Sequence, residues 1–190
     1  MVRAMFARAL LVCSLLLVLL IPGTALAGGV GFYGSPGFHA GPALSQAGGT
    51  GTWADLGGGI ELFLGKRDSR LHGRLRFGYN GVFDLTPLPE GVEAPPGSRI
   101  SHAAVISLGA KVDLLPDVEK PFSLYVAADI GVSPLVKHLK NYFWVDVGPG
   151  IRVNANDVLS VFAELTGVLR FENGFTGGAL LFVGVRLSFD

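Results

Sequence analysis

The sequence predicts an all-β protein, an eight-stranded antiparallel up-and-down β-barrel, and three observations lead to this fold class. Apolar and polar residues alternate with a period of two along eight separate stretches, as they do in strands with one apolar and one polar face. The connections between these stretches alternate along most of the chain between longer, irregular segments and short, polar turns. The even number of strands lets the first and the last pair antiparallel, which closes the sheet and hides its edges.

The stretch 71–84, LHGRLRFGYNGVFD, shows the alternation most clearly. Phe77 and Tyr79 share one face of the expected strand, while Arg74 and Arg76 share the other. At roughly 3.3 Å per residue, this strand is about as long as a tilted strand that crosses a bilayer. We therefore expect a transmembrane barrel.

The other stretches follow the same rule between turn-forming residues. Pro149 lacks a ladder donor, so we expect a bulge or bend at 148–150. The first stretch is the least regular because it contains Pro36 and several glycines. The expected strands are 29–38, 53–65, 71–84, 100–115, 122–132, 142–154, 158–170 and 176–189.

The connections differ between the two ends of the expected barrel. Segments 39–52, 85–99 and 133–141 are longer and irregular, and the prolines and glycines of 85–99 cannot continue a sheet. The connections after the second, fourth and sixth strands are short, polar turns, and the seventh connection is short as well. Long loops opposite short turns are typical of bacterial outer-membrane barrels, which have the short turns in the periplasm.

Residues 1–27 have the parts of a secretory signal peptide. Arg3 and Arg8 precede an apolar run, 9–21, and an Ala-Leu-Ala site ends at Ala27. We expect cleavage after Ala27, which leaves 28–190 as one barrel domain. A membrane anchor is the alternative, but the apolar run is short for a spanning helix. A lipoprotein is disfavoured because Cys13 lies early in the run.

Composition excludes several classes of protein. Fifteen Lys and Arg balance fifteen Asp and Glu, so no basic excess points to nucleic acid. The single cysteine, Cys13, lies in the expected signal peptide, and the mature chain therefore has no disulfide or thiolate chemistry. The mean hydropathy of +0.49 is high for a soluble protein. The mature chain nevertheless has no run of eighteen apolar residues that would form a transmembrane helix.

The polar faces of the expected strands carry charges of balanced sign. An eight-stranded barrel has an interior just wide enough for its side chains to fill, and an unpaired buried charge costs several kcal/mol. We therefore expect these charges to pair within a closed, structural lumen. A narrow ion path is the alternative, and the balance of signs disfavours a selective one. The predicted lumen charge network comprises Glu61, Arg74, Arg76, Lys111, Asp113, Asp129, Asp146, Arg152, Glu164 and Arg186.

Aromatic residues gather near the strand ends. Tyr and Trp favour the membrane–water interface, so these residues predict the two aromatic girdles of a membrane barrel. The alternative is ordinary packing in a core. The predicted interface aromatics are Trp53, Tyr79, Phe83, Tyr142, Phe143, Trp144, Phe171 and Phe175 on the side of the long loops, and Phe122 and Phe189 on the side of the short turns.

The expected terminal strand ends in the pattern Val185-x-Leu187-x-Phe189. Together with the signal peptide, the alternating strands and the loop asymmetry, this ending resembles the small outer-membrane β-barrel proteins of the OmpA-like and OmpX-like kind. The resemblance implies an outer-membrane location, contact with outer-membrane lipid and recognition of the C-terminal strand by the barrel-assembly machinery. In that family the chain normally ends on the aromatic residue, whereas here Asp190 follows.

The sequence predicts no catalytic, metal or cofactor site. Some small barrels of this type modify lipid A, and such chemistry would need a histidine and a serine on one face. Ser101 and His102 are adjacent, so they point to opposite faces of a strand. His39, His72 and His138 lie in expected loops or turns, where we expect them to be solvated, and no pair has metal-site spacing.

Three functions remain open from the sequence. The first is a structural or surface-interaction protein of the outer membrane, whose partner at the long loops is unknown. The second is a small pore, or a lateral conduit for hydrophobic molecules near Pro149. The third is a soluble, lipocalin-like periplasmic barrel with an apolar ligand, which would require the apolar faces of the strands to point inward.

Overall fold

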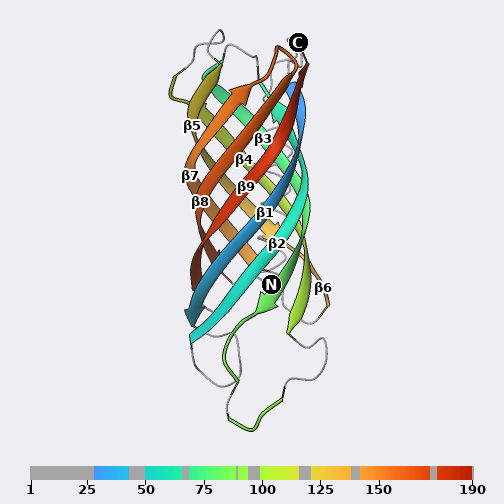
Figure 1. Cartoon of the computed structure of the whole chain (residues 1–190), viewed down its shortest axis with the longest axis vertical. Helices are drawn as coiled ribbons and strands as arrows, with labels where there is room; N and C mark the ends of the chain where they lie inside the picture. Colours follow the sequence, from blue (N-terminus) through green and yellow to red (C-terminus); the bar gives the residue numbers. More distant parts are fainter. Residues whose placement is uncertain are drawn as a thin grey trace, which may run out of the picture.

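The computed structural model describes residues 28–42, 50–65, 69–88, 90–93, 99–115, 121–137, 142–171 and 175–189, of which 42, 50, 135–137, 142 and 175 are placed by their backbone alone. The predicted signal peptide, 1–27, lies outside the described residues. The described strands are β1 (Gly28–Pro42), β2 (Thr50–Leu64), β3 (Leu71–Asp84), β4 (Ile100–Asp113), β5 (Phe122–Ser133), β6 (Leu135–Lys137), β7 (Tyr142–Asn154), β8 (Leu159–Phe171) and β9 (Phe175–Phe189), shown in Figure 1.

Eight long strands close into a barrel (Figure 1). Each long strand pairs antiparallel with the next along the chain, and β1 also pairs with β9, from Gly28 opposite Phe189 to Ala40 opposite Gly177. Closure gives every long strand two neighbours and leaves no long edge exposed. The predicted eight-stranded antiparallel up-and-down barrel is confirmed. No helix in the described ranges is long and apolar enough to cross a membrane.

The ninth strand, β6, continues the path of β5 after an interruption at Pro134. β4 pairs with β5 through Ile106 and Val132, and then pairs Ala103 with Leu135 of β6. The Ala104 N–H donates to the carbonyl oxygen of Pro134 at 3.1 Å. The expectation that 133–141 is entirely loop is therefore wrong, because β4 is long enough to pair beyond the proline.

The first connection is also shorter than the expected loop, 39–52. β1 and β2 stay paired until Pro42 lies opposite Thr50, so only 43–49 lie between the two strands, and they fall outside the described residues. Turn-forming residues suggested a loop here, but a long ladder with β2 and a second ladder with β9 keep this part of β1 in the sheet.

The expected bulge at 148–150 is wrong. β7 pairs with β8 through Val147 opposite Gly167 and again through Gly150 opposite Glu164. These two pairs belong to one uninterrupted register, although the two residues between them on each strand form no ladder pair. Pro149 lacks a ladder donor, but the paired residues on both sides hold the alignment of the two strands.

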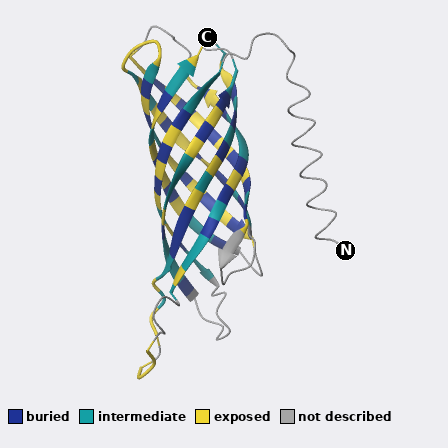
Figure 2. Cartoon of the chain, turned by 90° about the vertical axis from the view of Figure 1, so that its right-hand side faces the viewer, coloured by how far each residue is buried: buried dark blue, intermediate teal, exposed yellow. Residues whose placement is uncertain are grey.

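The alternation of the sequence becomes an outer and an inner face. Outward residues such as Ile130 and Leu165 are 45% and 57% exposed, whereas inward Arg74, Arg76 and Glu164 are fully buried. Figure 2 shows this alternation of buried and exposed residues along the strands. A soluble, lipocalin-like barrel would need the opposite arrangement, so the orientation of the faces contradicts that hypothesis.

Inward glycines make room for the largest inward side chains. A Cβ atom at Gly131 would collide with the indole ring of Trp144, and one at Gly150 would collide with the phenol ring of Tyr125. In each case the large side chain comes from the strand next to the glycine. The interior therefore packs because a glycine on one strand accommodates a ring from its neighbour. The same relation holds for Gly184 with Phe162, whereas Gly78 accommodates the hydroxyl group of Tyr33, which lies two strands away on β1.

Candidate functional site in the barrel interior

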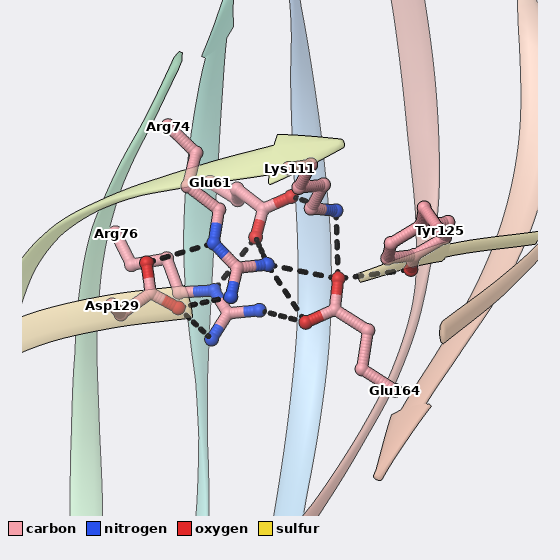
Figure 3. A network of polar contacts seen from close by, with 7 residues as sticks. All are labelled: Glu61, Arg74, Arg76, Lys111, Tyr125, Asp129 and Glu164. Carbon is pink, nitrogen blue, oxygen red and sulfur yellow. Dashed lines mark hydrogen bonds and ion pairs between the residues drawn. The ribbon is translucent and has the colours of Figure 1, made fainter. Parts of the chain in front are cut away.

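A cluster of charged side chains occupies the middle of the barrel, and we call it the central network (Figure 3). Inward parity and register bring its members together: Glu61 lies opposite Arg76 across β2 and β3, and Lys111 and Asp129 project from β4 and β5. The members of the central network are Glu61, Arg74, Arg76, Lys111, Tyr125, Asp129 and Glu164.

Arg74 joins three strands other than its own. Its Nε donates to Asp129 at 2.7 Å, and Nη2 contacts the second oxygen of that carboxylate. Its Nη1 donates to Glu164 at 2.7 Å and lies 3.5 Å from Glu61. A fork of this kind, satisfied by carboxylates on both sides, is the geometry that guanidinium groups favour.

Arg76 repeats this arrangement beside Arg74. Its Nε donates to Glu61 at 2.6 Å, Nη2 donates to Glu164 at 2.5 Å, and Nη1 donates to Asp129 at 3.3 Å. The guanidinium also lies 4.0 Å from the ring centroid of Phe182, within the range of a cation–π interaction.

Lys111 completes the charge balance. Its Nζ lies 2.7 Å from Glu164 and 3.0 Å from Glu61, and the Tyr125 hydroxyl donates to Glu164 at 2.9 Å. Three cations thus face the three carboxylates of Glu61, Asp129 and Glu164. Such an arrangement compensates charges that would each be costly if buried alone, and it ties β2, β3, β4, β5 and β8 together across the lumen.

The remaining predicted lumen residues also point into the barrel, but they do not belong to the central network. Arg152 and Asp113 lie 3.3 Å apart near the short turns. Arg186 lies over the ring of Phe63, 3.4 Å from its centroid. Asp146 is buried opposite Asp129, and neither of its oxygens has a hydrogen-bond partner among the described residues.

A second polar cluster lies nearer the long connections, and the sequence analysis missed it. Arg170 donates from Nη1 to His39 Nε2 at 2.8 Å and from Nη2 to Asp55, and His39 Nδ1 lies 3.2 Å from Asp55. His39 was expected in a solvated loop, but β1 extends past it and buries it. Asp55 and Arg170 share the inward parity of the predicted charges, and that parity was the signal available in the sequence.

His72 is another histidine that is not solvated. It is buried near the short turns, and its Nε2 lies 3.4 Å from Asp113. Its place at the start of β3, on the same face as Arg74, turns it inward. The expectation of a solvated turn histidine is therefore wrong for His72, whereas His138 lies outside the described residues.

Two of the predicted interface aromatics lie in the interior. Trp144 is buried and shares the parity of Asp146, so its indole ring packs inside the barrel. Trp53 stacks on the buried imidazole of His39, with 5.2 Å between ring centroids. Both assignments to a girdle are wrong, because parity outweighs nearness to a strand end. The side chains of Tyr142 and Phe175 are not described, whereas Tyr79, Phe83, Phe122, Phe143, Phe171 and Phe189 occupy outward positions near strand ends.

The space between the two polar clusters is nearly filled. A cavity of about 20 Å³ lies among Tyr33, Ser35, Asn80, Ser133 and Trp144 and their neighbours. A volume of this size holds about one water molecule. Within the described residues, no group of three or more His, Cys, Asp or Glu side chains could hold a metal ion.

Comparisons with known proteins reveal a shared fold. No protein-family model and no curated protein sequence matches the chain. Neisserial surface protein A (NspA) has a crystal structure that matches with a TM-score of 0.52 and 17% identity, over 85% of this chain and 97% of that one. A de novo designed transmembrane β-barrel matches with a TM-score of 0.40 and 13% identity, over 87% and 98%. Ail of Yersinia pestis matches with a TM-score of 0.29 and 9% identity, over 87% and 100%.

The likeness to NspA covers nearly the whole described barrel at low sequence identity, and it therefore concerns the fold. Together with the closed sheet of eight long strands, it shows that this chain has the fold of the small eight-stranded outer-membrane β-barrels.

Proposed function

We propose that this protein is exported by its signal peptide and spans the outer membrane, where it has a structural or surface-interaction role. The observation that carries the proposal is the distribution of polar and apolar side chains, which is the opposite of that in a soluble barrel. Ion pairs fill the interior, while large apolar side chains cover the outside. Such an outer surface is stable against lipid chains, and in water it would be an extended apolar patch far beyond that of soluble proteins. In this role the protein contacts outer-membrane lipid and, through β9, the barrel-assembly machinery.

The long connection between β3 and β4 supports a role at the cell surface. The described part of this connection, 85–88 and 90–93, continues past the end of the barrel (Figure 1). In its described part, Leu88 and Val92 are 42% and 52% exposed. Apolar side chains held away from both lipid and core are typical of a surface that binds another macromolecule. We propose that the long connections point outward from the cell and that 85–99 forms part of the contact surface.

Labelling of single cysteines in intact cells tests location and orientation together. The only native cysteine, Cys13, lies in the predicted signal peptide, so Glu93→Cys and Ala155→Cys each give one thiol at an exposed site on opposite ends of the barrel. We expect a membrane-impermeant maleimide to label Glu93→Cys in intact cells and Ala155→Cys only after lysis. Equal labelling of both, or recovery of the protein in the soluble periplasmic fraction, would contradict the proposal.

The proposed lumen is closed by paired charges and conducts no ions. The compensated central network, together with the rings of Tyr125 and Phe182 beside it, supports a closed lumen. We expect purified protein in planar bilayers to give no discrete channel steps, with a heat-dependent shift in electrophoretic migration as the control for folding. Reproducible single-channel steps from folded protein would favour the pore instead.

A further inference from the structure

The outer face of the barrel contains one polar pair among apolar neighbours. By register, outward positions alternate along every long strand. Among the described side chains at these positions, all are apolar or glycine except Thr52, Tyr79 and His102. His102 is the one basic side chain of this set, and it lies beside Tyr79. A polar group on a lipid-facing wall is costly unless it is hydrogen-bonded, so the position of this pair needs an explanation.

The two side chains hold one another in a fixed arrangement. The Tyr79 hydroxyl and His102 Nδ1 form a hydrogen bond, and the rings stack with centroids 5.7 Å apart and 22° between their planes. Tyr79 is 50% exposed. When the hydroxyl donates to Nδ1, the proton of the neutral imidazole is on Nε2, which becomes a donor. The hydrogen bond given by the described residues to His102 involves Nδ1 and leaves Nε2 available as a donor.

The residues directly opposite the pair on the neighbouring strands are small, and both side chains of the pair are at least partly exposed. Tyr79 lies between Gly58 on β2 and Ala104 on β4, and Gly81 lies opposite His102. None of these neighbours has a side chain larger than a methyl group. A ligand group can therefore approach the imidazole from the side of the lipid.

The position along the barrel favours a headgroup over an acyl chain. His102 is the third residue of β4, close to the end that bears the long connections. The backbone of β6 places Lys137 in register opposite His102, next to a shift in the ladder. A histidine N–H donor at the level where tyrosine marks the membrane interface favours an anionic oxygen ligand.

We propose that Tyr79 and His102 form a binding site on the outer wall for the phosphate of a lipid headgroup. The proposal rests on the proposed membrane location. His102 Nε2 donates to a phosphate oxygen, and Tyr79 positions the imidazole through Nδ1. The lipid chains then lie along the apolar outer face, from the pair toward the end of the barrel that bears the short turns.

Two lipids that differ only in the phosphate test this site. The folded barrel in dodecyl maltoside micelles is incubated with dimyristoyl phosphatidic acid or with dimyristoylglycerol, and bound lipid is measured by native mass spectrometry. We expect the wild-type barrel to bind phosphatidic acid about tenfold more tightly than His102→Ala does, the equivalent of one charge-assisted hydrogen bond. Tyr79→Phe keeps the ring and removes the hydroxyl. We expect its affinity for phosphatidic acid to lie between those of the wild type and His102→Ala.

Matched controls separate the possible outcomes. Ile106→Ala changes an outward residue of the same strand and is expected to bind phosphatidic acid like the wild type, and every variant must keep its heat-dependent migration shift. Equal binding of the two lipids by the wild type, or unchanged binding by His102→Ala, would overturn the site. Saturation by inorganic phosphate alone would also overturn it, because that result indicates a free-anion site. The lipid-binding experiment uses purified protein in micelles, whereas the cysteine-labelling experiment uses intact cells. A failure of the proposed membrane orientation can therefore be distinguished from a failure of the lipid site.

Discussion

Replacing Arg74 by methionine is expected to lower the free energy of unfolding of the barrel by about 3 to 5 kcal/mol. Arg74 contacts the carboxylates of Asp129, Glu164 and Glu61 in a fully buried site. Its loss leaves three carboxylates facing two cations, and water cannot compensate the surplus negative charge in so enclosed a space. The measurement is urea unfolding of the barrel refolded into lipid vesicles, followed by electrophoresis without boiling.

Two further variants test the physical reason. Arg74→Met combined with Asp129→Asn removes one charge of each sign, and we expect it to recover a large part of the lost stability. Arg152→Met removes a guanidinium that is 17% exposed and has one ion pair, to Asp113, so we expect a smaller loss than for the fully buried Arg74 with its three carboxylates. If the double variant were no more stable than Arg74→Met alone, charge imbalance would not be the cause.

Replacing Gly131 by alanine is expected to destabilise the barrel by about 1 to 3 kcal/mol, the usual cost of overpacking an interior. The new methyl group would collide with the Trp144 ring and would lie 2.9 Å from the Ile106 carbonyl oxygen. Trp144 is buried and cannot move away without displacing its own neighbours. Urea unfolding gives the loss of stability, and a change in tryptophan fluorescence reports the displaced ring.

Gly167→Ala is the matched control for this prediction. Gly167 lies outward on β8, where a Cβ atom would meet only the Val147 carbonyl oxygen at 3.9 Å. We expect a change within about 0.5 kcal/mol, as for surface substitutions in general. Equal losses for both variants would indicate a general intolerance of side chains at strand glycines, and the fit between Gly131 and Trp144 would then not be the reason.

The period of two along the strands also predicts the inner positions of Trp144 and Asp55. Trp144 lies between Phe143 and Val145 in the sequence, and its alternation with them places it on the inner face with Asp146. The same rule places Asp55 inside. Residue type, such as an aromatic near a strand end, is therefore a weaker indicator of the face than the period of two. In a closed barrel the backbone geometry decides the face, and the chemistry of the side chain must adapt to it.

Alternation along the chain was enough to predict the eight long strands and the two sets of residues that share a face, because a period of two is a local property of the chain. It could not decide which face points inward, since alternation looks the same from either side. It also could not pair Arg74 with Glu164, ninety positions away, or bury His39 against Arg170. Those contacts exist only once β1 pairs with β9, because closure fixes which strands face each other across the lumen and how little space remains between them.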